Sequence, residues 1–227
     1  MATNIPSVAE RAKLFRIWEA YDQSLPPFAP TKKMVVGYLR LPSDAAAIVE
    51  RAPEVRFVSG LTLPGWVTVE FNADEERVFN DTSTFRIING PLEDLLTECV
   101  RQLRDPVTAY LESCWRILNV RVWTTPPHST ISQMYSWHMD GMPDQIFKIM
   151  VYFTPMDAAH GGLETLKGPL LGPAGTWVLF WNSKIDHRGK AGASRIRASA
   201  EITLCRSVRY DLVLHQPGIN AHWPERP

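Results

Sequence analysis

Residues 175–199, GTWVLFWNSKIDHRGKAGASRIRAS, hold two strand-like runs on either side of a histidine and a glycine-rich turn. The first run ends at Trp181, and the second begins at Ile196. Apolar and β-branched runs bounded by Gly, Asp, Asn and Ser are typical of strands joined by turns. The stretch therefore predicts a strand, a polar turn that presents His187, and a second strand.

The second predicted strand carries an arginine and a serine at alternate positions. Arg197 and Ser199 should share one face, because successive side chains of a strand point to opposite faces. A guanidinium can bind a carboxylate through two parallel hydrogen bonds, and a neighbouring hydroxyl can donate one more. We expect this pair to bind the far carboxylate of a dicarboxylic co-substrate, with Arg195 on the same face as the alternative.

A second chemical motif lies upstream, in residues 135–143, YSWHMDGMP. His138 and Asp140 stand two apart at the end of a run that is predicted to be a strand, so one face should carry both. Together with His187 they would form the 2-His-1-carboxylate triad that is typical of non-haem Fe(II) oxygenases. Gln133, slightly upstream, is a candidate co-substrate contact.

Other interpretations of these residues remain open at this point. Without a third ligand, His138 and Asp140 would be a strand-end histidine and a turn aspartate. Asn182 and Asp186 flank His187 and are either partners that fix an imidazole or solvated turn residues.

The chain changes character near residue 118. Downstream, short aromatic or β-branched runs alternate with Pro, Gly, Asp and His, which indicates several strands arranged as a barrel or sandwich. The runs are NVRVWTT (119–125), TISQMYSWH (130–138), IFKIMVYFT (146–154), GTWVLFWN (175–182) and IRASAEITLC (196–205).

The N-terminal half mixes helices and strands. Helical spacing of apolar residues predicts helices over 7–23, 42–52 and 90–118, with Pro106 splitting the last of these. Short strands are predicted over 33–41, 55–60 and 65–71. No Gly- or Ser-rich linker marks a boundary, so we predict one domain over 1–227. It comprises a mixed support region (1–117), a metal-binding core (118–206) and a C-terminal tail (207–227).

The order of the motifs resembles a known superfamily. The HxD at 138–140, the stretch KIMVYFTPMDAAHGGLETLKG (148–168), the stretch GTWVLFWNSKIDHRG (175–189) and Arg197 resemble the Fe(II)/2-oxoglutarate-dependent oxygenases. Within that superfamily they are most similar to the phytanoyl-CoA dioxygenase-like group. The similarity covers roughly residues 118–206.

The resemblance implies a mainly β protein with flanking α-helices, built on a double-stranded β-helix (jelly-roll, cupin-like) core. It implies that His138, Asp140 and His187 bind Fe(II) and that Arg197 binds 2-oxoglutarate. The implied reaction uses O2 to hydroxylate, desaturate or cyclise a small molecule, such as an amino acid derivative or natural-product intermediate, and forms succinate and CO2.

The amino acid composition argues against several kinds of partner. Lys plus Arg and Asp plus Glu each number 24, so no net charge attracts nucleic acid or a membrane surface. The N-terminal residues lack a signal-peptide core, and no run of ~18 apolar residues is present. Three widely spaced cysteines without a CxxC favour a reducing compartment. We expect a cytoplasmic protein whose oligomeric state the sequence leaves open.

The same fold would also suit a different function. The chain could be a non-catalytic jelly-roll binding protein, or a cupin-like metalloenzyme that does not use 2-oxoglutarate. The intact HxD motif and the Arg197-x-Ser199 pair behind His187 favour the oxygenase.

Overall fold

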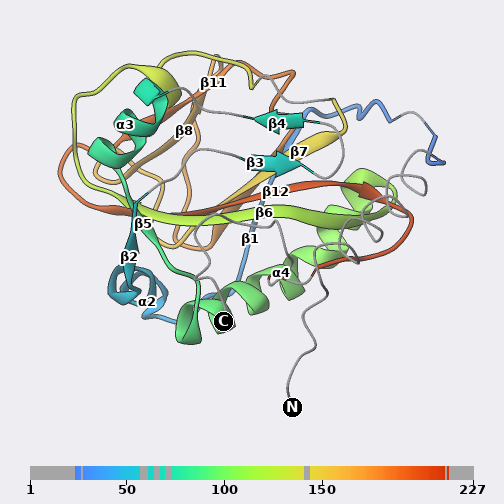
Figure 1. Cartoon of the computed structure of the whole chain (residues 1–227), viewed down its shortest axis with the longest axis horizontal. Helices are drawn as coiled ribbons and strands as arrows, with labels where there is room; N and C mark the ends of the chain where they lie inside the picture. The colour runs from blue at the N-terminus through green and yellow to red at the C-terminus, as the bar shows by residue number, and fades with distance from the viewer. Residues whose placement is uncertain are drawn as a thin grey trace.

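The computed structural model describes residues 24–26, 28–56, 61–63, 67–69, 73–140, 144–212 and 214. Its centre is a seven-stranded antiparallel sheet with the strand order β1-β10-β7-β12-β6-β5-β2 (Figure 1). These strands are β1 (Met34–Tyr38), β10 (Thr176–Phe180), β7 (Ile146–Tyr152), β12 (Arg197–Ser207), β6 (Cys114–Thr125), β5 (Thr84–Arg86) and β2 (Glu54–Val55).

A second, smaller antiparallel sheet completes the core. It has the order β11-β8-β9, with β11 (His187–Ala191), β8 (Gly161–Thr165) and β9 (Gly168–Pro169). A separate two-stranded ladder pairs β3 (Leu61–Leu63) with β4 (Val67–Val69). The fold is therefore mainly β, with flanking helices, as the resemblance implied.

The helices described in the structure are few, and the longest packs on the large sheet. They are α2 (Ala45–Arg51), α3 (Ala73–Thr82), α4 (Gly90–Leu111) and the short 3-10 helix η1 (Gln133–Tyr135). Figure 1 shows α4 lying along the large sheet. Apolar residues at helical spacing along α4 are buried in one cluster with the inner face of that sheet. None of the helices described combines the length and apolar character needed to cross a bilayer.

The central strand β12 has two chemically different faces. Ala198, Ala200 and Ile202 belong to the apolar cluster under α4, and all three are fully buried. Arg197 and Glu201, at alternate positions, line a cavity on the opposite face of the sheet. The period of two in a strand thus separates the residues that stabilise the fold from those available for chemistry.

Several predicted elements differ from the structure. Helix α4 continues through Pro106, whose ring faces solvent, so the predicted split is wrong. Residues 114–118 belong to β6, because their backbone pairs with β12 instead of extending the helix. The predicted strand over 130–138 is an irregular segment that contains η1. The predicted helix over 7–23 lies outside the described residues, and the one-domain organisation stays a prediction.

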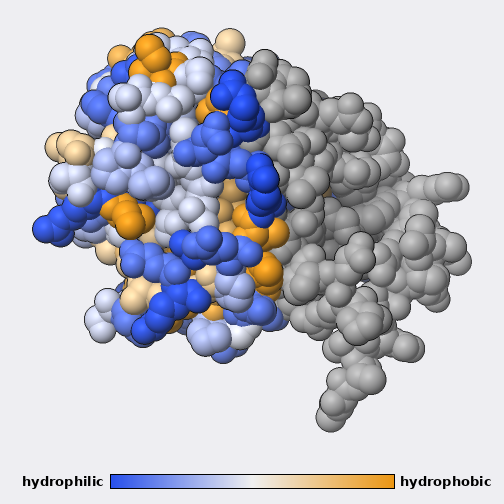
Figure 2. Space-filling view, turned by 60° about the vertical axis from the view of Figure 1, so that its left-hand side comes forward, coloured by the Kyte–Doolittle hydropathy of each residue, from blue (hydrophilic) through white to orange (hydrophobic). Residues whose placement is uncertain are grey.

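The outer surface gives little sign of a large apolar interface on the face seen in Figure 2. Polar residues dominate the coloured part of this face, and apolar residues occur in small separate groups. The three cysteines are free thiols, and Cys99 and Cys205 are buried.

Candidate metal centre and co-substrate pocket

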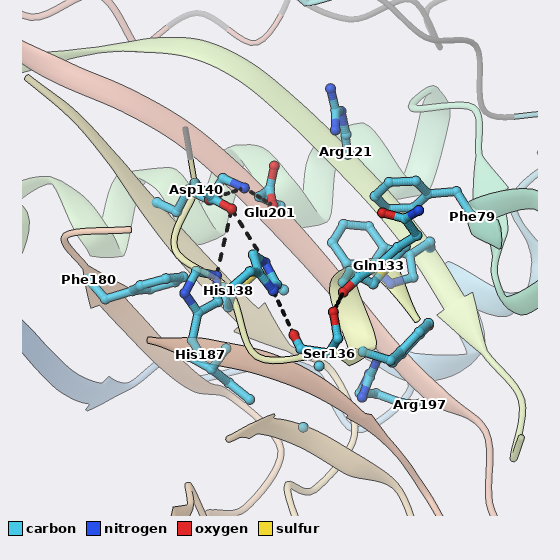
Figure 3. Close-up of a pocket in the computed structure, with 18 of the residues that line it drawn as sticks. Phe79, Arg121, Gln133, Ser136, His138, Asp140, Phe180, His187, Arg197 and Glu201 are labelled. Carbon is cyan, nitrogen blue, oxygen red and sulfur yellow. Dashed lines mark hydrogen bonds and ion pairs between the residues drawn. The ribbon is translucent and has the colours of Figure 1, made fainter. Parts of the chain in front are cut away.

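Three potential metal ligands meet at one end of the cavity between the two sheets. His138 and Asp140 follow η1, and His187 is the first residue of β11 (Figure 3). The backbone N–H of His138 donates to the carbonyl of His187 at 3.0 Å, and the reverse bond measures 2.9 Å. This bridge places the two histidines side by side, although they are far apart in sequence.

The ligand atoms of the triad are almost within coordination distance of a common ion. Oδ1 of Asp140 lies 3.5 Å from Nε2 of His138 and 3.8 Å from Nε2 of His187. All three ligand atoms lie within 4.8 Å of one another. Since ligands ~2.1 Å from an ion at right angles are about 3 Å apart, only a small contraction would close the triad on a metal.

Both imidazoles are held in the tautomer that a metal ligand needs. Nδ1 of His138 lies 2.8 Å from the carbonyl oxygen of Ser136, and Nδ1 of His187 lies 2.8 Å from that of Ile185. A carbonyl oxygen only accepts hydrogen bonds, so Nδ1 carries the proton in each ring. The lone pair of each neutral ring is then on Nε2, which faces Asp140.

Asp140 is held as a carboxylate. Burial alone would raise its pKa, but Lys148 and the two histidines outweigh burial and hold the pKa of Asp140 well below its usual range. Its Oδ2 lies 2.7 Å from Nζ of Lys148 and accepts a 3.0 Å hydrogen bond from Nδ2 of Asn182. Asn182 is therefore a buried partner of the carboxylate, where we expected a partner of an imidazole or a solvated turn residue.

The surroundings shift the pKa values of the two histidines in opposite directions. Burial lowers the pKa of His187 below its ordinary value. For His138, burial is opposed by hydrogen bonds to Asp140 and to the Ser136 carbonyl, which raise its pKa. His187 is thus the more readily neutral of the two rings.

Lys148, on β7, also binds a second carboxylate. Its Nζ lies 3.2 Å from Oε2 of Glu201 on β12. Burial would lower the pKa of Lys148, but the two carboxylates raise it above its ordinary value, so the ammonium is charged. Arg121, opposite Glu201 on β6, lines the same cavity and is buried.

Sequence reasoning missed Lys148, Glu201 and Arg121. The available signal was a charged residue inside each apolar run: Lys148 in 146–154, Arg121 in 119–125, and Glu201, besides Arg197, in 196–205. Charged side chains inside a buried strand are rare unless they are paired or functional.

The candidate co-substrate residues Arg197 and Ser199 lie at the start of β12 and are buried. Arg197 is 5% exposed; its guanidinium donates to the carbonyl of Lys190 at 2.5 Å and to Oγ1 of Thr125 at 3.2 Å. Among the described residues, Nε of Arg197 and Oγ of Ser199 are buried without a protein hydrogen-bond partner. Such groups are costly unless a ligand satisfies them, and a carboxylate would suit both donors.

Two other predicted contacts have different outcomes. Arg195 lies in the turn before β12 and is exposed, so the expectation that it shares the face of Arg197 is wrong. Its position precedes the first strand residue, where alternation does not apply. Gln133, by contrast, lines the cavity from η1, where its backbone has a φ of 54°.

The cavity that joins these groups has a volume of about 390 Å³. Its apolar wall includes side chains from α3, β5, β6, β7 and β10, which are Phe79, Phe85, Trp123, Met150, Tyr152 and Phe180. The polar side chains that line the cavity lie near the triad and around Arg197 (Figure 3). A pocket of this size with a few placed polar groups is typical of small-molecule sites.

Comparison with protein-family models and with curated protein sequences finds no match. Solved structures do match. The viral collagen prolyl hydroxylase vCPH of Paramecium Bursaria Chlorella virus-1, in complex with 2-oxoglutarate, aligns with a TM-score of 0.52 at 14% identity. That alignment covers 79% of this chain and 98% of vCPH.

EctD from S. alaskensis with bound Fe aligns with a TM-score of 0.50 at 17% identity, over 100% of this chain and 84% of EctD. At such low identity the likeness is one of fold, and the phytanoyl-CoA dioxygenase-like subgroup is not distinguished by it. The chain thus has the double-stranded β-helix fold of Fe(II)/2-oxoglutarate oxygenases, with a His-Asp-His triad.

Proposed function

We propose that this protein is an Fe(II)- and 2-oxoglutarate-dependent oxygenase that hydroxylates, or desaturates or cyclises, a small molecule. One observation carries the proposal. The triad of His138, Asp140 and His187 and the incompletely satisfied guanidinium of Arg197 line the same cavity. Two imidazoles and one carboxylate suit Fe(II) with positions left open, and a buried arginine suits a dicarboxylic co-substrate.

The chain's own residues would divide the work as follows. His138, Asp140 and His187 hold the iron, while Arg197 and Ser199 bind the far carboxylate of 2-oxoglutarate. When bound, the iron and 2-oxoglutarate supply the O2-dependent oxidising chemistry, with succinate and CO2 as co-products. The aromatic wall of the cavity, which includes Trp123 and Phe180, keeps water from the reacting groups.

The substrate class follows from size and charge. The cavity of about 390 Å³ must accommodate both the co-substrate and the substrate, which favours a metabolite-sized molecule. An amino acid derivative or a natural-product intermediate fits that size. The balance of 24 basic and 24 acidic residues gives no support to a nucleic-acid substrate.

The test is anaerobic loading with Fe(II), addition of 2-oxoglutarate, and then exposure to O2 with ascorbate. We expect a visible absorption band that requires both Fe(II) and 2-oxoglutarate, followed by succinate formation. The His138→Ala protein should show neither. If the unaltered protein shows neither, the oxygenase proposal is wrong, and a metalloprotein without a 2-oxo acid or a binding protein replaces it.

A further inference from the structure

A largely buried row of alternating charges runs away from the candidate metal site. Oδ2 of Asp140, Nζ of Lys148 and Oε2 of Glu201 follow one another at 2.7 and 3.2 Å. The three side chains are only 13–14% exposed. They come from the segment after η1, from β7 and from β12, and Figure 3 shows the carboxylates of Asp140 and Glu201 close together. The oxygenase proposal itself gives Lys148 and Glu201 no role.

We propose that Lys148 is a positioning residue. It ensures that, besides the two histidines, only one carboxylate oxygen of the protein binds the metal. It does so by occupying Oδ2 of Asp140 and by holding Glu201 away from the ion. This inference rests on the proposed function, because it concerns the same site and explains how open positions are preserved there.

The first argument concerns the two oxygens of Asp140. Oδ1 faces Nε2 of both histidines, at 3.5 and 3.8 Å, and is the oxygen placed to bind a metal. Oδ2 faces the other way and meets two donors, Lys148 at 2.7 Å and Asn182 at 3.0 Å. A carboxylate can bind a cation through one oxygen or through both. With Oδ2 engaged by two donors, binding through both would break two hydrogen bonds.

The second argument concerns Glu201. Its side chain lines the cavity, yet within the described part of the chain the close group of candidate metal ligands consists of His138, Asp140 and His187. The Lys148 ammonium stands between the two carboxylates and compensates both. Without it, the two carboxylates would share the cavity with the Arg121 guanidinium, and a bound divalent cation would supply the countercharge that Lys148 provides now.

The consequence is a site with room for co-substrate. A six-coordinate ion held by three protein atoms keeps three positions open, and a chelating co-substrate and O2 require all three. Every extra carboxylate oxygen on the ion would remove one open position, and binding of Glu201 would also add negative charge beside an anionic co-substrate. Lys148 should therefore strengthen the binding of 2-oxoglutarate without strengthening the binding of the metal.

Calorimetric titration of the full-length protein tests this, with Co(II) as the metal and 2-oxoglutarate as the co-substrate. The variants are Lys148→Met, which keeps the apolar stem, and the double variant Lys148→Met/Glu201→Gln. We expect Lys148→Met to bind Co(II) at least as tightly as the unaltered protein. We expect its affinity for 2-oxoglutarate, at equal Co(II) loading, to fall about 10-fold or more.

The double variant should recover part of the lost 2-oxoglutarate affinity, because the competing carboxylate is gone. It also keeps the cavity free of an uncompensated charge, so it provides a folded protein if Lys148→Met alone does not fold. If Lys148 only stabilised the fold through its ion pairs, Lys148→Met should bind both Co(II) and 2-oxoglutarate more weakly. That result, or unchanged 2-oxoglutarate affinity in the variants, overturns the inference.

The two proposals fail in different ways. If the unaltered protein binds Co(II) but not 2-oxoglutarate, the oxygenase proposal is wrong. The Co(II) affinities of Lys148→Met and the unaltered protein still test whether Lys148 restrains the carboxylates.

Discussion

Arg195 and Arg197 are two positions apart and have the same side chain, yet their surroundings differ completely. Arg197 is buried, and two of its guanidinium nitrogens are fixed by Lys190 and Thr125. Arg195 is exposed in the preceding turn. This contrast makes Arg195 a matched control for Arg197.

We expect Arg197→Met to lower the affinity for 2-oxoglutarate about 30-fold while Co(II) affinity is unchanged. Hydrogen bonds to charged groups contribute about 1.5–3 kcal/mol each, which corresponds to roughly 10- to 150-fold in affinity. Titration of 2-oxoglutarate into Co(II)-loaded protein measures it. Arg195→Met should bind like the unaltered protein; the reverse result would assign the carboxylate to Arg195.

Cys99 offers a test at the residue scale that is independent of function. Its side chain is fully buried in α4, and burial, with a smaller contribution from Glu98, raises the pKa of the Cys99 thiol to about 12. The thiolate is the reactive form, so Cys99 should resist alkylation. After iodoacetamide treatment of the native protein at pH 8, mass spectrometry should find Cys99 unmodified and the partly exposed Cys114 modified. Urea should abolish the protection of Cys99.

At the scale of elements, the position of His187 depends on the pairing of β11 with β8. Gly161 begins β8 with a φ of 78°, and a Cβ on it would lie 2.1 Å from the carbonyl oxygen of Lys190 in β11. An alanine there is both strained and obstructed. The small sheet would have to open, and His187 would shift.

Gly161→Ala should therefore weaken Co(II) binding more than 10-fold and lower the free energy of unfolding by about 1–3 kcal/mol. Calorimetric titration and urea unfolding measure the two effects. Leu166→Ala, at a 71% exposed position just after β8, is the control and should change neither. Normal metal affinity in Gly161→Ala would show that β8 does not position His187.

The elements that sequence reasoning predicted well are those with a clear local pattern. Aromatic or β-branched runs located β7, β10 and β12, and helical spacing located α4. Predictions from local sequence failed where pairing with a distant strand determines the secondary structure. Residues 114–118 suit a helix, but pairing with β12 makes them a strand. The aromatic run 130–138 lacks a continuous partner strand, and only His138 forms a bridge, with His187.

For the candidate site, spacing and order along the chain pointed to His138, Asp140, His187 and Arg197, and the structure brings these four residues to one cavity. Their roles stay predictions. The contact between Lys148 and Glu201 depends on the lateral pairing of β7 with β12, which no local pattern encodes. Asn182 reaches Asp140 for the same reason, through the return of the chain after β10.

For the whole molecule, ligand binding should raise the free energy of unfolding and the melting temperature. A ligand that binds only the folded state stabilises it by about 2.7 kcal/mol at 100 times its Kd. The melting temperature should therefore rise when Co(II) is added, rise again with 2-oxoglutarate, and return to the starting value with a chelator. His187→Gln should not respond to Co(II). An equal response in His187→Gln would place the ion elsewhere.

The two faces of the central strands also bear on how such a protein can change over time. Trp123, Met150 and Phe180 point into the cavity, while their neighbours Val122, Ile149 and Leu179 pack in the core with α4. A library randomised only at the first three positions would alter the shape of the pocket and leave the helix-packed core intact. Alternate positions of the same strands can thus change the specificity of the pocket while the cluster packed with α4 keeps its residues.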